Sequence, residues 1–167
     1  MNKQHTISIL VSNRPGVLAR ISGLFSRRGY NIDSLSVCAT EDDNFSRMTV
    51  TVCGNDKILN QILNQLEKQV DVVKLADFEA NKSVFRELLI IKINCTPAQR
   101  SEIVDICTIF KAKTIDISAD DTMIIELTGI TSKIDALIEI LKPYGVLEMA
   151  RAGGAALERG AGTLRTK

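Results

Sequence analysis

The order in which strand and helix patterns follow one another limits the fold of this chain most, because one order occurs twice. Three segments of the first half alternate apolar and polar residues, as strands with one buried face do: 5–11, 34–39 and 48–53. A fourth strand is predicted over 70–78. Two further segments carry apolar residues at helical spacing: 17–25 and 58–66. In chain order they read strand, helix, strand, strand, helix, strand, which is the ferredoxin-like βαββαβ motif.

The second half repeats this order after a short polar linker at Glu79–Ser83. Its strand patterns lie at four places: 87–94, 114–118, 122–128 and 146–151. Thr96 with Pro97, and Thr131 with Ser132, are residue pairs that begin helices, so they predict the two helices between these strands. The segment 87–94 is rich in Leu and Ile, and this near-continuous apolar character predicts a strand buried on both faces. The sequence therefore predicts an α+β fold of two consecutive ferredoxin-like βαββαβ modules.

These patterns set the expected domain boundaries. We expect one module over residues 1–79, a second over 84–151, and a flexible Gly-rich tail over 152–167. Five of the ten glycines lie at or beyond Gly145, and such a segment has too little side chain to order itself. Each module has about 80 residues, a size at which sheet edges are commonly covered by pairing. We therefore expect at least a homodimer.

Composition argues against nucleic acid and membrane partners. Lys plus Arg is 21 and Asp plus Glu is 20, so the net charge is only +1, and aromatic residues make up 4% of the chain. A nucleic-acid binder usually carries a basic excess and aromatic platforms for bases. No apolar run approaches the roughly 20 residues of a membrane helix. The first residues resemble no signal or transit peptide, so we expect a cytoplasmic protein.

Catalytic and metal-binding patterns are absent from the sequence. His5, the single histidine, lies near the N-terminus, and the four cysteines form no CxxC pair, so we expect no metal site and reduced cysteines that serve as small apolar residues. The chain has no phosphate-binding Walker loop and no GxGxxG sequence. These observations favour a regulator or binder without catalytic residues over an enzyme.

The loop at Asn13–Leu18 is the best candidate for a ligand site. It places Gly16 where a strand turns into a helix, and the unpaired N–H groups of a helix start attract a carboxylate. Asn31, just after the predicted helix, offers both amide donors and a carbonyl acceptor. The combination predicts a site for a free aliphatic amino acid. Strand–Pro–Gly–helix junctions also occur for structural reasons alone, and Asn31 also suits a left-handed turn.

The internal repeat provides a comparison for this loop. When Pro15 is aligned with Pro97, Ala98 stands in place of Gly16 and Lys113 in place of Asn31. The second module thus keeps the start of the helix but loses both candidate ligand residues. This favours a ligand in the first module only, although independent divergence of the two modules would produce the same difference.

Two motifs in the first module resemble the ACT domain, a small regulatory domain that binds amino acids. They are Asn13-Arg14-Pro15-Gly16-Val17-Leu18-Ala19-Arg20-Ile21 and Arg28-Gly29-Tyr30-Asn31-Ile32-Asp33-Ser34-Leu35. With segments 46–50, 86–93 and 150–160, the likeness extends from His5 to about Gly162 and is closest to the regulatory, or small, subunits of acetolactate synthase, also called acetohydroxyacid synthase.

This resemblance implies a function and a set of site residues. It implies homodimers whose ACT modules pair edge to edge, with valine, leucine or isoleucine bound at the interface. The matching positions are Asn13, Gly16, Val17 and Leu18 from one chain, with Asn31 and Ile32 from the adjoining chain. It also implies that the chain holds no cofactor itself. Its partner would be the catalytic (large) subunit, which uses thiamine diphosphate, Mg²⁺ and FAD, and the small subunit would activate it and confer feedback inhibition by valine in branched-chain amino acid biosynthesis.

Three alternatives remain at the level of sequence. An ACT-type sensor could regulate another enzyme or gene expression, although no helix-turn-helix pattern is present. RNA-recognition modules share the βαββαβ topology, but they stack bases on strand aromatics, and the segment Met48–Thr51 has none. An acylphosphatase-like enzyme with Arg14 holding phosphate is the least favoured.

Overall fold

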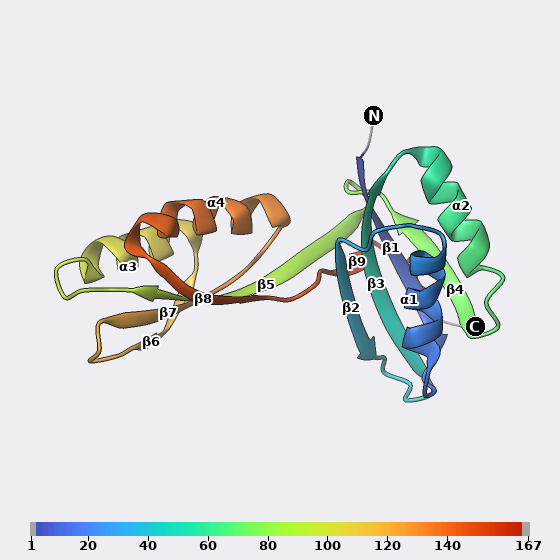
Figure 1. Ribbon diagram of the computed structural model, residues 1–167, viewed down its shortest axis with the longest axis horizontal. Helices are drawn as coiled ribbons and strands as arrows, with labels where there is room; N and C mark the ends of the chain where they lie inside the picture. The colour runs from blue at the N-terminus through green and yellow to red at the C-terminus, as the bar shows by residue number, and fades with distance from the viewer. Residues whose placement is uncertain (1–2, 165–167) are drawn as a thin grey trace. The chain divides into compact units, whose positions relative to one another are not determined.

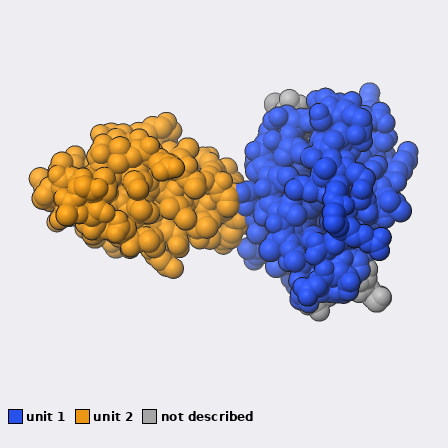
Figure 2. All heavy atoms as spheres, turned by 60° about the horizontal axis from the view of Figure 1, so that its bottom comes forward, with its two compact units in different colours: residues 1–85, 153–167 blue, residues 86–152 orange. Residues whose placement is uncertain are grey.

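The computed structural model describes residues 3–164, which divide into two compact units (Figures 1 and 2). Unit 1 contains the described residues up to Phe85 together with those from Gly153 onward, and unit 2 contains Arg86–Ala152. Each unit has a separate hydrophobic core. The chain therefore leaves unit 1, forms unit 2 and returns to unit 1.

Unit 1 has a four-stranded antiparallel sheet in the order β2-β3-β1-β4 (Figure 1). The elements are β1 Lys3–Ser12, α1 Val17–Arg27, β2 Ser34–Ala39, β3 Phe45–Gly54, α2 Asp56–Leu66 and β4 Val72–Phe78. Ile7 is opposite Val50 in the register, and Ile9 is opposite Met48. Because side chains alternate along a strand, all four lie on one face, where both helices bury their apolar stripes.

Local sequence explains where the helices of unit 1 begin and end. The Asn55 side chain caps α2 by accepting a hydrogen bond from the Ile58 N–H at 3.0 Å. Helix α1 buries four side chains: Val17, Ile21, Leu24 and Phe25. It is followed by Gly29, whose φ of +69° lies in the left-handed region that favours glycine.

Unit 2 repeats the topology with the sheet order β6-β7-β5-β8. Its elements are β5 Ser83–Asn94, α3 Arg100–Phe110, β6 Lys113–Ile117, β7 Thr122–Gly129, α4 Thr131–Leu141, the 3₁₀ helix η1 Lys142–Tyr144 and β8 Val146–Arg151. The first three residues of β5 belong to unit 1. The predicted α+β fold of two βαββαβ modules is confirmed.

Strand β5 differs from the expectation in two respects. It begins at Ser83, so the last residue of the predicted linker is already part of the strand. Burial of both faces was the wrong prediction, because Leu89 and Ile91 are fully buried whereas Leu88 and Ile90 are 36% and 42% exposed. In an antiparallel sheet with both helices on one side, the other face has no helix to cover it. The apolar run therefore does not mark two buried faces here.

Up to Leu164, the C-terminal segment also differs from the flexible tail predicted over 152–167, of which residues 165–167 lie outside the described part of the chain. Residues Ala155–Glu158 form strand β9, which pairs with β5, and Ala156 and Leu164 are only 3% and 5% exposed. Small residues make this close packing possible. A Cβ on Gly153 would lie 2.5 Å from the Leu35 carbonyl oxygen, and one on Gly154 would overlap the Phe85 ring. Residues 153–164 are therefore an ordered part of unit 1, called here the roof segment.

The cysteines are free thiols, in line with the sequence, but only two of them act as core residues. Cys95 and Cys107 are buried in unit 2, whereas Cys38 and Cys53 are exposed. Burial raises the pKa of the Cys107 thiol. Within residues 3–164, no helix is both long and apolar enough to cross a membrane.

Candidate functional site

The loop between β1 and α1 is fixed by its neighbours. Gly16 precedes the helix with a φ of +83°, a left-handed conformation that other residues rarely adopt. Asn13 binds the β2–β3 hairpin twice: its backbone N–H donates to the Asn44 carbonyl at 2.7 Å, and its Nδ2 donates to the Asp43 carbonyl at 2.8 Å. The loop and the hairpin therefore hold each other in place.

The first turn of α1 presents backbone donors to an anion. The Val17 N–H donates to the Arg14 carbonyl at 3.3 Å, and no partner for the Leu18 or Ala19 N–H is found among the described residues. The first turn contains no acidic residue, and no side chain caps it. The positive end of the helix dipole therefore points at a loop that can accept a carboxylate.

A buried carboxylate orients an arginine beside this turn. Arg20 Nε lies 2.7 Å from Asp71 Oδ2, and Asp71 is only 7% exposed. A Cβ on Gly16 would lie 3.4 Å from Arg20 Nη1, so the guanidinium lies close to the loop. Arg20 thus adds positive charge beside the free N–H groups, at a position set by Asp71.

The predicted site residues lie in two places. Asn13, Gly16, Val17 and Leu18 lie before and in the first turn of α1, whereas Asn31 and Ile32 follow the other end of the helix. The 11 residues of α1 span about 16 Å. One chain therefore does not bring the two groups together.

The exposure of these residues limits what each can offer a ligand. Leu18 is 45% exposed and has a free apolar side chain, but Val17 is 3% exposed and packs in the core. Ile32 also packs against the core and is half-buried. Asn31 is exposed, and its Nδ2 donates to Asp33 Oδ1 at 2.9 Å.

Sequence reasoning missed two residues that belong to this environment. Arg20 lies four residues after Gly16, so helical spacing alone would have placed it beside the loop. Asp71 is far from both in sequence and is brought to Arg20 only by the tertiary fold. No sequence signal marked it.

Comparison with known proteins matches both units. A model described as "AHAS small subunit-like ACT domain" matches residues 7–74, and one described as "Small subunit of acetolactate synthase" matches residues 86–160. The probable acetolactate synthase small subunit of Archaeoglobus fulgidus is 46% identical over 157 residues, covering 94% of this chain and 98% of that protein. The acetolactate synthase small subunit of Mycolicibacterium smegmatis is 46% identical over 156 residues, covering 93% and 91%.

A solved structure agrees with these relatives. The crystal structure of the acetolactate synthase small subunit from Thermotoga maritima superposes with a TM-score of 0.87 at 39% identity, covering 95% of this chain and 98% of that one. The fold and the loop thus define a two-module protein with an N-terminal ACT domain. The chain belongs to the family of acetolactate synthase small subunits, and this membership supports a regulatory role.

Proposed function

We propose that this chain is the regulatory subunit of an acetolactate synthase. It raises the activity of a separate catalytic subunit and makes that subunit sensitive to valine, the feedback effector of branched-chain amino acid biosynthesis in the cytoplasm. In this proposal the catalytic subunit carries thiamine diphosphate, Mg²⁺ and FAD, and this chain contributes no catalytic group. The observation that carries the proposal is the first turn of α1, which holds no acidic residue and where free N–H groups and the Asp71-bound Arg20 lie beside Gly16.

A second chain completes the proposed valine site. Asn31 and Ile32 lie just before β2, which is an edge strand of the unit 1 sheet. Edge strands of two chains can pair, and a two-fold pairing presents residues of one chain to the other. In this arrangement the loop amides of one chain bind the valine carboxylate, and Asn31 of the adjoining chain meets its polar end. Leu18 supports recognition of the branched side chain because it is exposed beside the free amides.

The regulatory proposal is tested with the purified chain and its catalytic subunit. Mixing the two should raise the rate of acetolactate formation, and valine should then lower it. Leucine and isoleucine, titrated in parallel, rank the three effectors. If the chain neither stimulates the catalytic subunit nor confers inhibition by any of them, the proposal is wrong.

Leu18→Glu tests the site itself. It adds a carboxylate to the first turn, which suits the helix dipole but competes with the ligand carboxylate. We therefore expect valine affinity to fall at least tenfold in calorimetry without a lower melting temperature. Asn60→Glu places the same charge on the exposed side of α2 and is the matched control. This design avoids the backbone strain that any side chain at Gly16 would introduce.

Mixed dimers test whether two chains share the site. A Leu18→Glu chain and an Asn31→Ala chain should each bind valine poorly alone. A dimer that contains one of each has one site with both changes and one with neither, so binding should return at half the wild-type stoichiometry. If the mixture binds no better than either variant, each chain holds its own site.

A further inference from the structure

The face of the unit 1 sheet opposite its helices is covered by the chain's own roof segment. Ser8, Thr49 and Thr51 alternate with the core residues of β1 and β3, so they point to this face, yet they are 0%, 3% and 1% exposed. Two hydrogen bonds to its backbone hold the roof segment in place: the Arg159 N–H donates to the Lys82 carbonyl at 2.8 Å, and the Lys74 side chain donates from Nζ to the Thr163 carbonyl at 3.1 Å.

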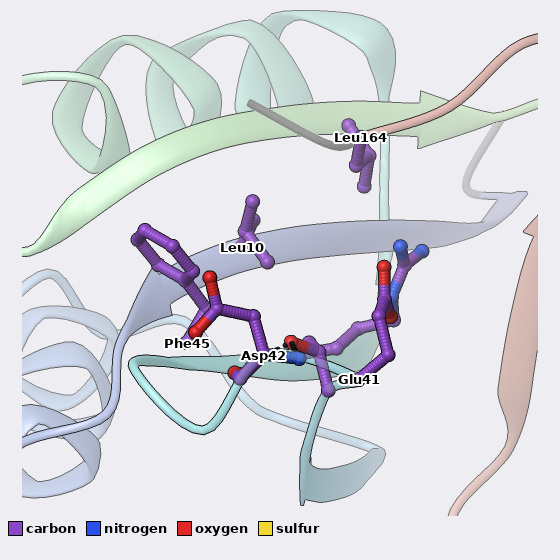
Figure 3. A pocket seen from close by; sticks show the side chains of 7 residues that line it. Leu10, Glu41, Asp42, Phe45 and Leu164 are labelled. Atoms are coloured by element: carbon purple, nitrogen blue, oxygen red, sulfur yellow. Dashed lines mark hydrogen bonds between the residues drawn. The ribbon is translucent and has the colours of Figure 1, made fainter. Parts of the chain in front are cut away.

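Cavities remain between the roof segment and the sheet. Three of them, of about 160, 280 and 310 Å³, are each lined by Arg47 and Glu41. Figure 3 shows the first, in which Leu10 of β1 and Leu164 of the roof segment lie near the acidic side chains of Glu41 and Asp42. The two larger cavities are also lined by Leu157 of the roof segment. The third of these, of about 310 Å³, reaches the lower end of the size range of small-molecule sites.

Arg47 has unused hydrogen-bonding capacity at the point where the cavities meet. In the register of the sheet it lies between Leu10 of β1 and Cys38 of β2, on the covered face. A guanidinium has five N–H donors, and the hydrogen bond found for Arg47 within the described part of the chain is one from Nη1 to Ser8 Oγ at 3.4 Å. Because Arg47 is also half-buried, its charge is less screened than that of an exposed arginine. It is well placed to bind a carboxylate in paired fashion.

The rest of the lining determines which carboxylate fits. Asp42 and Glu158 add negative charge around Arg47, so a ligand with only negative charge is repelled there. Leu157, Leu164 and Phe78 provide apolar surface beside these charges. A small molecule that carries a carboxylate, an ammonium group and an aliphatic side chain matches all three kinds of lining.

The lining is also connected to the β1–α1 loop. Asp42 Oδ1 accepts a hydrogen bond from the Asn44 N–H at 3.0 Å, and the Asn44 carbonyl accepts one from the Asn13 N–H at 2.7 Å. A ligand that binds beside Asp42 therefore acts on the hairpin that holds the loop. The geometry provides a physical route for coupling between the two places.

From these observations we propose that unit 1 has a separate amino-acid site under the roof segment. It binds an aliphatic amino acid with the carboxylate on Arg47, the ammonium group toward the acidic side chains, and the side chain among the leucines of the roof segment. This site is separate from the loop at Gly16 and does not depend on the proposed regulatory function.

The test is a titration of the full chain with L-leucine. Binding is monitored by NMR through the backbone amide resonances of residues 157–163 of the roof segment. We expect shifts of these resonances in the wild-type chain and in Leu18→Glu, whose loop site is blocked. In Arg47→Met the apparent affinity reported by the same resonances should fall at least tenfold. Arg27→Met removes an exposed arginine of α1 and should leave the affinity unchanged.

Two analogues separate the charges of the ligand. 4-Methylpentanoate lacks the ammonium group and isopentylamine lacks the carboxylate, so each should bind at least tenfold more weakly than leucine. If Arg47→Met does not fold, Arg47→Lys provides the same test, because lysine cannot form the paired contact. The proposal is overturned if leucine does not shift the roof resonances, if Arg47 variants respond like the wild-type chain, or if either analogue binds as well as leucine.

Discussion

Gly153→Ala tests whether the roof segment is held by close backbone packing. The added Cβ would lie 2.5 Å from the Leu35 carbonyl oxygen, a backbone atom that cannot rotate away. Overpacking by one methyl group costs about 1–3 kcal/mol. Burial of the Leu164 and Ala156 side chains together contributes about 3 kcal/mol to keeping the segment in place. The substitution should therefore remove much of the free energy that keeps the segment closed.

The assay is hydrogen exchange at the Arg159 amide, which donates to Lys82 only while the segment is in place. A loss of about 2 kcal/mol predicts exchange about 30-fold faster. Gly162→Ala is the matched control, because its added Cβ meets only the mobile carboxylate end of Glu158. Exchange in Gly153→Ala within twofold of that control would refute the reasoning.

Three further changes test the stability of individual elements. Asn55→Ala removes the cap that accepts from the Ile58 N–H and should lower the free energy of unfolding by about 1 kcal/mol in urea denaturation. Arg151→Met leaves the buried Glu87 carboxylate without its 2.6 Å ion pair and should cost about 3 kcal/mol in the same assay. Burial raises the pKa of the Asp77 carboxyl, so the folded state binds its proton more tightly than the unfolded state does. The stability that the protonated group contributes is therefore lost as pH rises from about 4 through the folded pKa. Asp77→Asn should therefore raise the melting temperature at pH 7 but not at pH 3, and equal effects at both would contradict this cause.

The sequence was sufficient to predict the elements because their periodicity is strong. Hydrophobic spacing defined both βαββαβ modules, and strand β8 lies where the pattern placed it, at Val146–Arg151. The same reasoning failed for β5, whose exposed Leu88 and Ile90 are apolar like its buried residues. Composition alone cannot distinguish an apolar residue in a core from one on an uncovered sheet face.

The candidate site was only partly predictable for a related reason. Gly16 could be found because the residue before α1 has a positive φ, a backbone conformation that favours glycine. Asp71 and the roof segment could not be found, because their roles depend on contacts between residues far apart in the sequence. The composition of a glycine-rich segment predicts mobility, and only the surface against which it packs shows that it is ordered. Here that surface lies on β2 and around Phe85.

The return of the chain to unit 1 has a consequence for how the protein is synthesised. Residues 3–85 emerge from the ribosome before unit 2, but the segment that covers their sheet emerges after it. The nascent ACT domain therefore has one uncovered sheet face until the segment after residue 152 has also left the ribosome. During this interval Leu10 and the serine and threonine side chains of that face are exposed to solvent. A translational pause within unit 2 would therefore lengthen the time in which a chaperone or another nascent chain can bind to the face.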